Sequence, residues 1–120
     1  MTPRIRALQD QIRGIKRELT QLEVLRPGSL SRQFNICGSP GCRCKASPPH
    51  KHGPYYHLSY TRNAKGGTRS IHKGDVPAVR AALANYARLK RLVDRWIDLA
   101  TELSDLELET RPSRKPSKRA

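Results

Sequence analysis

Isoleucine and leucine recur at every third or fourth position near the N-terminus of the chain. Thr2 suits the N-cap of a helix, Pro3 its first turn, and Pro27-Gly28 a stop. This spacing is the heptad pattern of an amphipathic helix. The sequence therefore predicts a helix over residues 3–25, with an apolar stripe made of Ile5, Leu8, Ile12, Ile15, Leu19 and Leu22.

A second and longer stripe follows in the last third of the chain. Asp75 is a good N-cap, Pro77 is tolerated in a first turn, and Pro112 ends the pattern. These signals predict a helix over residues 76–109, whose stripe consists of Val79, Leu83, Tyr86, Val93, Trp96, Ala100 and Leu103.

The charges of the two predicted helices favour antiparallel pairing. The second helix ends in acidic residues, which oppose its own dipole, and the first begins with Arg4 and Arg6. An antiparallel hairpin brings these ends together, so that each offsets the other. The first turns of the longer helix, residues 76–83, then need a partner. We expect the middle segment to cover them, or otherwise a second chain to form a homodimer.

The middle segment, residues 26–75, changes to a period of two after His52. Tyr56, Leu58 and Tyr60 would face one way, and the residues between them the other. A glycine-containing loop at 63–67 and a return strand at 68–72 complete a predicted β-hairpin.

Together these elements predict an α+β fold, mainly α, in which an antiparallel two-helix coiled-coil hairpin carries an inserted small zinc-knuckle and β-hairpin lobe. Residues 1–110 would form a single domain. Residues 111–120 lack an apolar anchor and are expected to be a disordered basic tail. The hydrophobic fraction of 36% is enough for a thin core.

The three cysteines, Cys37, Cys42 and Cys44, lie close together in the middle segment, and a histidine-rich stretch follows. Thiolates with an imidazole make a tetrahedral zinc set, and the Gly-Ser-Pro-Gly turn between the first two lets them converge. We predict one Zn²⁺ per chain, with His52 as the fourth ligand. The other candidates for that position are His50, His57 and His72. Three free thiols with surface histidines are the alternative, and an iron–sulfur cluster or a nucleophilic Cys42 is a weaker one.

The cysteine usage also bears on the compartment of the protein. Three clustered cysteines do not suit a disulfide framework, and we expect neither a secretion signal nor a membrane span. A cytoplasmic location is the expectation, because thiols stay reduced there.

The net charge of +14 comes mainly from residues 26–75 and the tail. Such a charge favours polyanionic partners, of which nucleic acid is the commonest. Tyr55 could stack on a base or belong to the core of the lobe. The predicted nucleic-acid-binding residues are Arg32, Arg43, Lys45, Lys51, Tyr55, Arg62, Lys65, Arg69 and Lys73.

Acidic residues offer no catalytic pair, since most of them lie on the second predicted helix, where a solvated face explains them. We therefore predict a non-catalytic, zinc-binding and nucleic-acid-binding accessory protein. The alternative is a coiled-coil protein–protein interaction module or adaptor without direct nucleic-acid contact.

Three stretches of the chain resemble a family of short uncharacterised bacterial proteins. They are Leu-Arg-Pro-Gly-Ser-Leu-Ser-Arg-Gln from Leu25, Cys-Gly-x-Pro-x-Cys-x-Cys from Cys37, and His-Gly-Pro-Tyr-Tyr-x-Leu-Ser-Tyr from His52. The likeness continues through Asn85-Tyr86 and Val93–Trp96. It implies a bacterial or mobile-element context and makes His52 the matching histidine, but it implies no activity.

Overall fold

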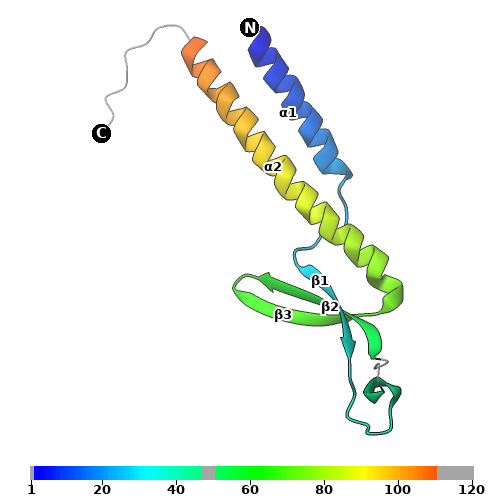
Figure 1. The fold of residues 1–120 in the computed structure, drawn as a ribbon. Helices are drawn as coiled ribbons and strands as arrows, with labels where there is room; N and C mark the ends of the chain where they lie inside the picture. The colour runs from blue at the N-terminus through cyan, green and yellow to red at the C-terminus, as the bar shows by residue number, and fades with distance from the viewer. Residues whose placement is uncertain (1, 47–50, 111–120) are drawn as a thin grey trace. The chain divides into compact units, whose positions relative to one another are not determined.

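The computed structural model describes residues 2–46 and 51–110, which form two helices and one three-stranded sheet (Figure 1). The described residues divide into two compact units, one made of residues 2–22 and 89–110 and the other lying within residues 23–88. The elements, in chain order, are α1 Pro3–Gln21, β1 Ser29–Asn35, η1 Arg43–Lys45, β2 His52–Arg62, β3 Lys65–Ile71, η2 Lys73–Asp75 and α2 Val76–Thr110.

The first unit is built on the apolar stripe of α1. The hydroxyl of Thr2 accepts a hydrogen bond from the Ile5 amide at 3.2 Å, which caps the helix as its sequence predicts. The core of this unit consists of Leu8, Ile12, Ile15, Leu92 and Leu99, all buried. The predicted stripe residues Leu19, Leu22, Trp96, Ala100 and Leu103 pack around it.

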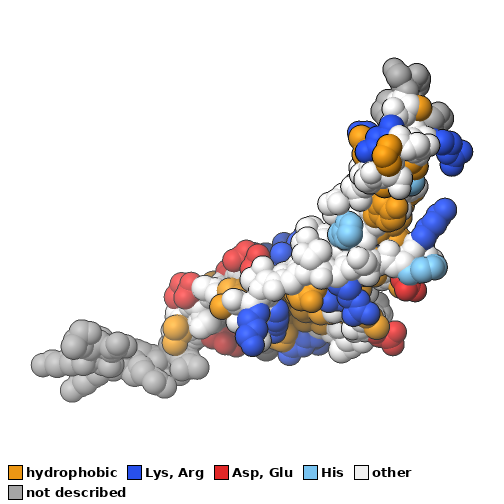
Figure 2. Space-filling model, turned by 90° about the horizontal axis from the view of Figure 1, so that it is seen from below, with side chains coloured by type: hydrophobic (Ala, Val, Ile, Leu, Met, Phe, Trp, Pro, Cys, Tyr) orange, Lys and Arg blue, Asp and Glu red, His pale blue; other side chains and the backbone are white. Residues whose placement is uncertain are grey.

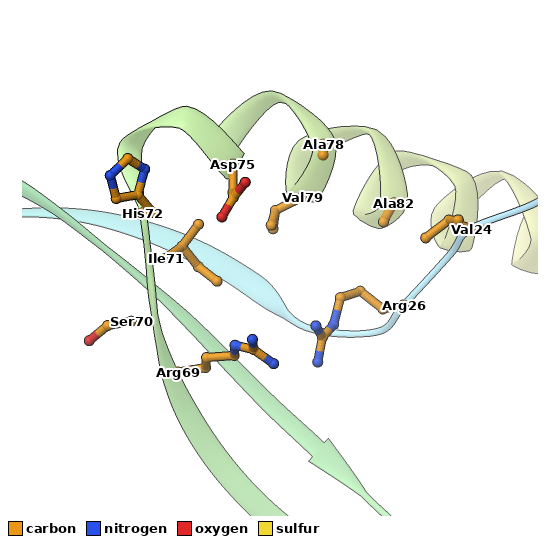
Figure 3. A pocket seen from close by; sticks show the side chains of 10 residues that line it. All are labelled: Val24, Arg26, Arg69, Ser70, Ile71, His72, Asp75, Ala78, Val79 and Ala82. Atoms are coloured by element: carbon orange, nitrogen blue, oxygen red, sulfur yellow. The ribbon is translucent and has the colours of Figure 1, made fainter.

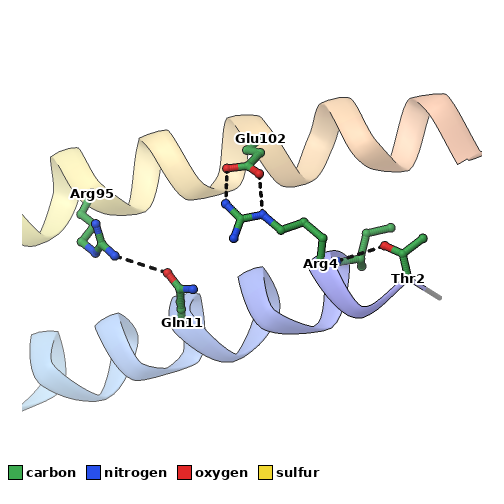
Figure 4. A network of polar contacts seen from close by, with 6 residues as sticks. Thr2, Arg4, Gln11, Arg95 and Glu102 are labelled. Atoms are coloured by element: carbon green, nitrogen blue, oxygen red, sulfur yellow. Dashed lines mark hydrogen bonds and ion pairs between the residues drawn. The ribbon is translucent and has the colours of Figure 1, made fainter.

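Polar contacts join α1 to the second half of α2 (Figure 4). The Arg4 guanidinium donates two hydrogen bonds to Glu102, at 2.6 and 2.7 Å, and so forms a bidentate ion pair. Arg95 donates to Gln11 at 3.3 Å, and the ammonium of Lys16 lies 5.2 Å from the ring centre of Trp96. The start of α1 therefore contacts the last turns of α2.

The second unit contains an antiparallel sheet in the order β1-β2-β3. The predicted β-hairpin is present as β2 and β3, but its loop is shorter than the predicted 63–67, because Asn63 and Ala64 alone connect the strands. Both of these residues have positive φ, 52° and 64°, as a two-residue type I′ turn requires. Leu58, at the centre of β2, is fully buried.

The predicted fold class is wrong, because the middle segment is not a lobe inserted into a coiled-coil hairpin. β1 pairs with β2 along most of its length, so the segment forms a three-stranded sheet. That sheet and the first turns of α2 make up a compact unit of their own. The sequence prediction overlooked β1, whose hydrogen bonds need a partner strand far along the chain.

The helix boundaries differ in one place from those predicted. α1 ends at Gln21 and not at residue 25, because Leu22 already has an extended backbone with φ −76° and ψ 131°. The chain therefore leaves the helix before Pro27-Gly28. α2 matches the predicted range to within one residue.

Neither helix, over the residues described, has an apolar stretch of the length that crossing a bilayer requires. His50 and the predicted tail, residues 111–120, lie outside the described residues.

Candidate metal centre

Strand pairing places His52 beside the cysteine loop. The register of β1 and β2 shifts between Gln33 and Asn35, and beyond this irregularity Asn35 pairs with His52. Cys37 follows Asn35 by two residues, so the sheet itself brings a histidine and a thiol together. His52 is the first residue of β2.

Gly53 permits this close approach of the two strands. Its φ is +136°, a backbone conformation that residues other than glycine rarely adopt. A Cβ atom at this position would lie 2.8 Å from the carbonyl oxygen of Gln33 and 3.1 Å from the ring of Phe34. Glycine is therefore the residue that lets β1 and His52 meet.

The other three ligand candidates come from a loop closed by backbone hydrogen bonds. The Cys42 amide donates to the Ser39 carbonyl at 3.3 Å, and the Lys45 amide donates to the Cys42 carbonyl at 3.0 Å. The Cys37 amide donates to the sulfur of Cys44 at 3.3 Å. The predicted tight turn thus exists, and at least one of its backbone amides points at sulfur.

Cys37, Cys42, Cys44 and His52 form a cluster in which the ligand atoms all lie within 4.8 Å of one another. The sulfurs of Cys37 and Cys44 are 3.5 Å apart, and that of Cys42 lies 3.0 Å from Nε2 of His52. Ligands bound at 2.0–2.3 Å around a tetrahedral ion are separated by about 3.5–3.8 Å. Small side-chain movements therefore bring all four atoms to bonding distance of one metal ion.

The local environment favours the thiolate form of Cys37, the form that binds metal ions. A backbone hydrogen bond at Ser39, with further hydrogen bonds from Cys44 and His52, lowers the pKa of Cys37 to about 6. Burial instead raises the pKa of Cys44, which is wholly enclosed. A divalent cation would favour the thiolate form of all three sulfurs, because its charge is the largest in the site.

The cluster confirms the predicted proximity of the three cysteines and His52, and it could hold a metal ion. His57 and His72 are not part of it. His57 lies within β2 and pairs with Ser31 and Ser70. Nδ1 of His72 accepts a hydrogen bond from the Gly74 amide at 3.0 Å, which caps η2.

The residues predicted to bind nucleic acid are distributed over both faces of the sheet. Directly paired residues of an antiparallel sheet share a face, so Arg32 and Arg69 lie on the face of Leu58. Tyr55, which is 44% exposed, lies on the opposite face with His57. Arg62 and Lys65 flank the hairpin turn, Arg43 and Lys45 belong to η1, Lys51 precedes β2, and Lys73 begins η2.

Two features beside the cluster were not predicted from the sequence. Phe34 and Ile36 are large apolar residues that are about half exposed, and the Arg32 guanidinium lies 5.6 Å from the ring centre of Phe34. The alternation of Leu30, Phe34 and Ile36 with polar residues was the available signal for β1.

The fold and the cluster define a small α+β protein with a candidate Cys₃His metal centre. The chain belongs to the family described as a domain of unknown function (DUF6788), which matches residues 5–81. The matched range contains all four residues of the cluster and the whole sheet. It agrees with the expected membership of an uncharacterised family, while the Val93–Trp96 stretch lies beyond it. No curated protein and no solved structure matches the chain.

Proposed function

We propose that the chain is a non-catalytic accessory protein that binds Zn²⁺ at the Cys₃His cluster and nucleic acid beside it. The observation that carries this proposal is the convergence of three sulfurs and one imidazole nitrogen within 4.8 Å. A metal bound there would fix the shape of a loop that otherwise has a small core. The cationic and aromatic side chains around that loop would then be held in place for a partner.

The ligand set favours zinc among the common metals. Thiolate sulfur and imidazole nitrogen suit Zn²⁺, whereas Mg²⁺ and Ca²⁺ prefer oxygen ligands. All four ligands come from the chain, which is typical of structural zinc sites and leaves no open position for a reacting molecule. The reducing cytoplasm, which we propose as the location, would keep the thiols available.

The surroundings of the cluster support a polyanionic partner. Arg43 lies between Cys42 and Cys44, and Lys45 follows Cys44; both belong to η1 and are exposed. Lys51, which precedes His52, is also exposed. Asp75 is the only acidic residue of segment 26–75. In the space-filling view, Lys and Arg side chains lie among hydrophobic ones on the visible face, which also shows Asp and Glu side chains (Figure 2).

Phe34 and Arg32 give this region a means of contacting bases. Phe34 is 48% exposed, and the guanidinium of Arg32 lies close to its ring. Aromatic rings and guanidinium planes stack on unpaired bases, and neighbouring cations bind the phosphates. We therefore propose single-stranded nucleic acid as the preferred partner of this region.

Metal analysis of the purified full-length chain tests the zinc proposal. We expect one zinc ion per chain, with loss of the metal in Cys42→Ser and in His52→Gln. The matched controls His57→Gln and His72→Gln should keep it. A metal-free protein with an ordered loop, or loss of zinc in a control and not in His52→Gln, would overturn the assignment.

Fluorescence anisotropy with labelled single-stranded and duplex oligonucleotides tests nucleic-acid binding. The triple variant Arg43→Gln, Lys45→Gln, Lys51→Gln should bind more weakly, with a salt dependence shallower by roughly 2 in slope if all three contact phosphates. A control with the same loss of charge carries Arg6→Gln, Arg17→Gln and Arg91→Gln on the helices. Equal weakening of both triple variants would contradict a specific surface, and the absence of binding at low salt would contradict the function.

A protein-interaction role is the second candidate, and one observation in the helical unit favours it. Val93, Ile97 and Leu108 lie on one side of α2 and are exposed, Ile97 to 56%. Light scattering of the purified chain and of Ile97→Glu tests this role. A complex that dissociates in the variant would support it, and a monomer in both would restrict the role to a partner of another sequence.

A further inference from the structure

A cavity of about 510 Å³ lies within the sheet unit, between β3, the segment before β1 and the first turns of α2. Its volume is in the range of sites for small organic ligands. It shares no residue with the Cys₃His cluster. Its walls are formed by side chains of residues such as Arg26, Arg69, Ile71, Asp75, Val79 and Ala82.

Two guanidinium groups meet at one side of this cavity. Arg26 reaches it from the segment before β1 and Arg69 from β3, and their charged ends point toward one another (Figure 3). Neither forms an ion pair with a carboxylate among the residues that the structure describes. Two like charges facing each other across a hollow favour an anion between them.

Arg26 is held in this position by its surroundings. Its amide donates to the Ala82 carbonyl at 3.2 Å, and its guanidinium lies 5.4 Å from the ring centre of Tyr60. Its Nε is buried and has no hydrogen-bond partner among the described residues. A buried donor without an acceptor is unfavourable, so the guanidinium would gain from a small shift that brings Nε to an anionic oxygen in the cavity.

The other residues that line the cavity indicate which further groups a ligand would need. Ile71, Val79 and Ala82 present an apolar surface of small and branched side chains. The carboxylate of Asp75 points into the same space from the turn before α2 (Figure 3). It would accept a hydrogen bond from an N–H group and repel a second anionic group.

From this arrangement we infer a binding site for a small organic anion. Its ligand has a carboxylate or phosphate for Arg26 and Arg69, an apolar body for Ile71 and Val79, and an N–H donor for Asp75. The site is independent of the proposed metal centre, because it uses none of the cluster residues. It assigns Arg69 to this cavity, whereas the sequence alone placed this residue on a nucleic-acid-binding surface.

Nuclear magnetic resonance of the ¹⁵N-labelled full-length chain tests the site with two probes. Adenosine monophosphate offers a phosphate, and tryptophan offers a carboxylate, each with a flat ring and N–H donors. We expect saturable shifts of the amide signals of Ile71, Ala78 and Ala82 with at least one probe. The probe that saturates identifies the anionic group, and inorganic phosphate should bind more weakly than adenosine monophosphate.

Three variants make this test specific. Arg69→Gln should weaken binding about tenfold, as expected for a lost charge-assisted contact. Ala78→Leu should block the cavity, because Ala78 lines it on an exposed helix position that tolerates leucine. Arg91→Gln, at an exposed position of α2 outside the sheet unit, is the control for charge and should leave the affinity unchanged.

The inference is overturned if neither probe shifts these amides at millimolar concentration. Equal weakening by Arg91→Gln and Arg69→Gln would also overturn it, because binding would then follow net charge. If adenosine monophosphate is the probe that saturates, an equal affinity for inorganic phosphate would reduce the site to a bare anion contact and contradict the organic ligand. Each result can be obtained whether or not the chain binds nucleic acid.

Discussion

Sγ of Cys42 lies 3.0 Å from Nε2 of His52, and strand pairing keeps these two residues together. His52 begins β2 and pairs with Asn35 at the end of β1, so its position depends on how closely the two strands approach. Gly53 sets that approach, because its missing Cβ leaves room for the Gln33 carbonyl. The candidate metal centre is thus a property of the sheet as well as of the cysteine loop.

Gly53→Ala should therefore weaken metal binding without changing a ligand. The added Cβ would meet the Gln33 oxygen at 2.8 Å, and a φ of +136° is strained for alanine by about 1–3 kcal/mol. The measurement is a zinc competition titration with a chromophoric chelator. Gly41→Ala is the control, since nothing lies within 4 Å of its added Cβ. Equal zinc affinity of both variants would show that strand approach does not control the site.

The cluster was predictable from sequence, whereas the sheet that completes it was not. Cys37, Cys42 and Cys44 are close in the chain, so their spacing alone limits how they can converge. His52 was chosen among the four histidines from the sequence, and the strand register explains why it reaches the cysteines. The register depends on β1, which contains Arg32 and Gln33 and lies mostly at the surface. A strand of this kind is stabilised by pairing with another strand. The pattern of hydrophobic and polar residues within it therefore predicts it poorly.

The helices were predicted better because their signals are local. The stripe of α1 and its Thr2 cap depend on neighbours three or four residues apart. The end of α1 at Gln21 was missed, since apolar Leu22 and Leu25 continue the pattern after the backbone has become extended. The cavity at Arg26 and Arg69 was invisible for the same reason as β1, because its walls come from segments far apart in the chain.

The Arg4–Glu102 ion pair predicts a small acid-sensitive contribution to stability. The hydrogen bond from Arg4 is the main cause that lowers the pKa of Glu102 below its ordinary value of 4.5. Folding therefore favours the carboxylate, so the contribution is present above pH 4.5 and is lost as the pH falls below it. Melting temperatures of the native chain and of Glu102→Gln should differ at pH 7 and converge toward pH 3.

Glu109→Gln is the control for this ion pair, because it removes the same charge from an exposed position near the end of α2. Its melting temperature should follow that of the native chain more closely than Glu102→Gln does at pH 7. Both side chains in the contact are about half exposed to solvent, so the difference should shrink in high salt. A difference that persists at pH 3 would assign the effect to packing of the Glu102 side chain.

Gly67→Ala should disturb the ring on which Arg26 rests. A Cβ at Gly67 would lie 2.8 Å from the Tyr60 ring, whereas one at Gly66 meets only ordinary contacts at 3.7 Å or more. Overpacking of this kind typically costs about 1–3 kcal/mol. Urea unfolding should show a lower midpoint for Gly67→Ala than for Gly66→Ala. If the two midpoints are equal, the ring can move freely, and Tyr60 does not hold Arg26 in place.

Leu8 should be the most sensitive position of the helical unit. It is fully buried against Ile12, Leu92 and the other core residues, so Leu8→Ala leaves a cavity and should lower the free energy of unfolding by about 2–5 kcal/mol. Ile97→Ala removes a similar volume from an exposed position. It should change the free energy of unfolding little, since alanine is also the better helix former. Thermal unfolding followed by helical circular dichroism compares the two. Similar losses for both would mean that Ile97 is covered in solution, and would favour the protein-interaction role of the α2 surface.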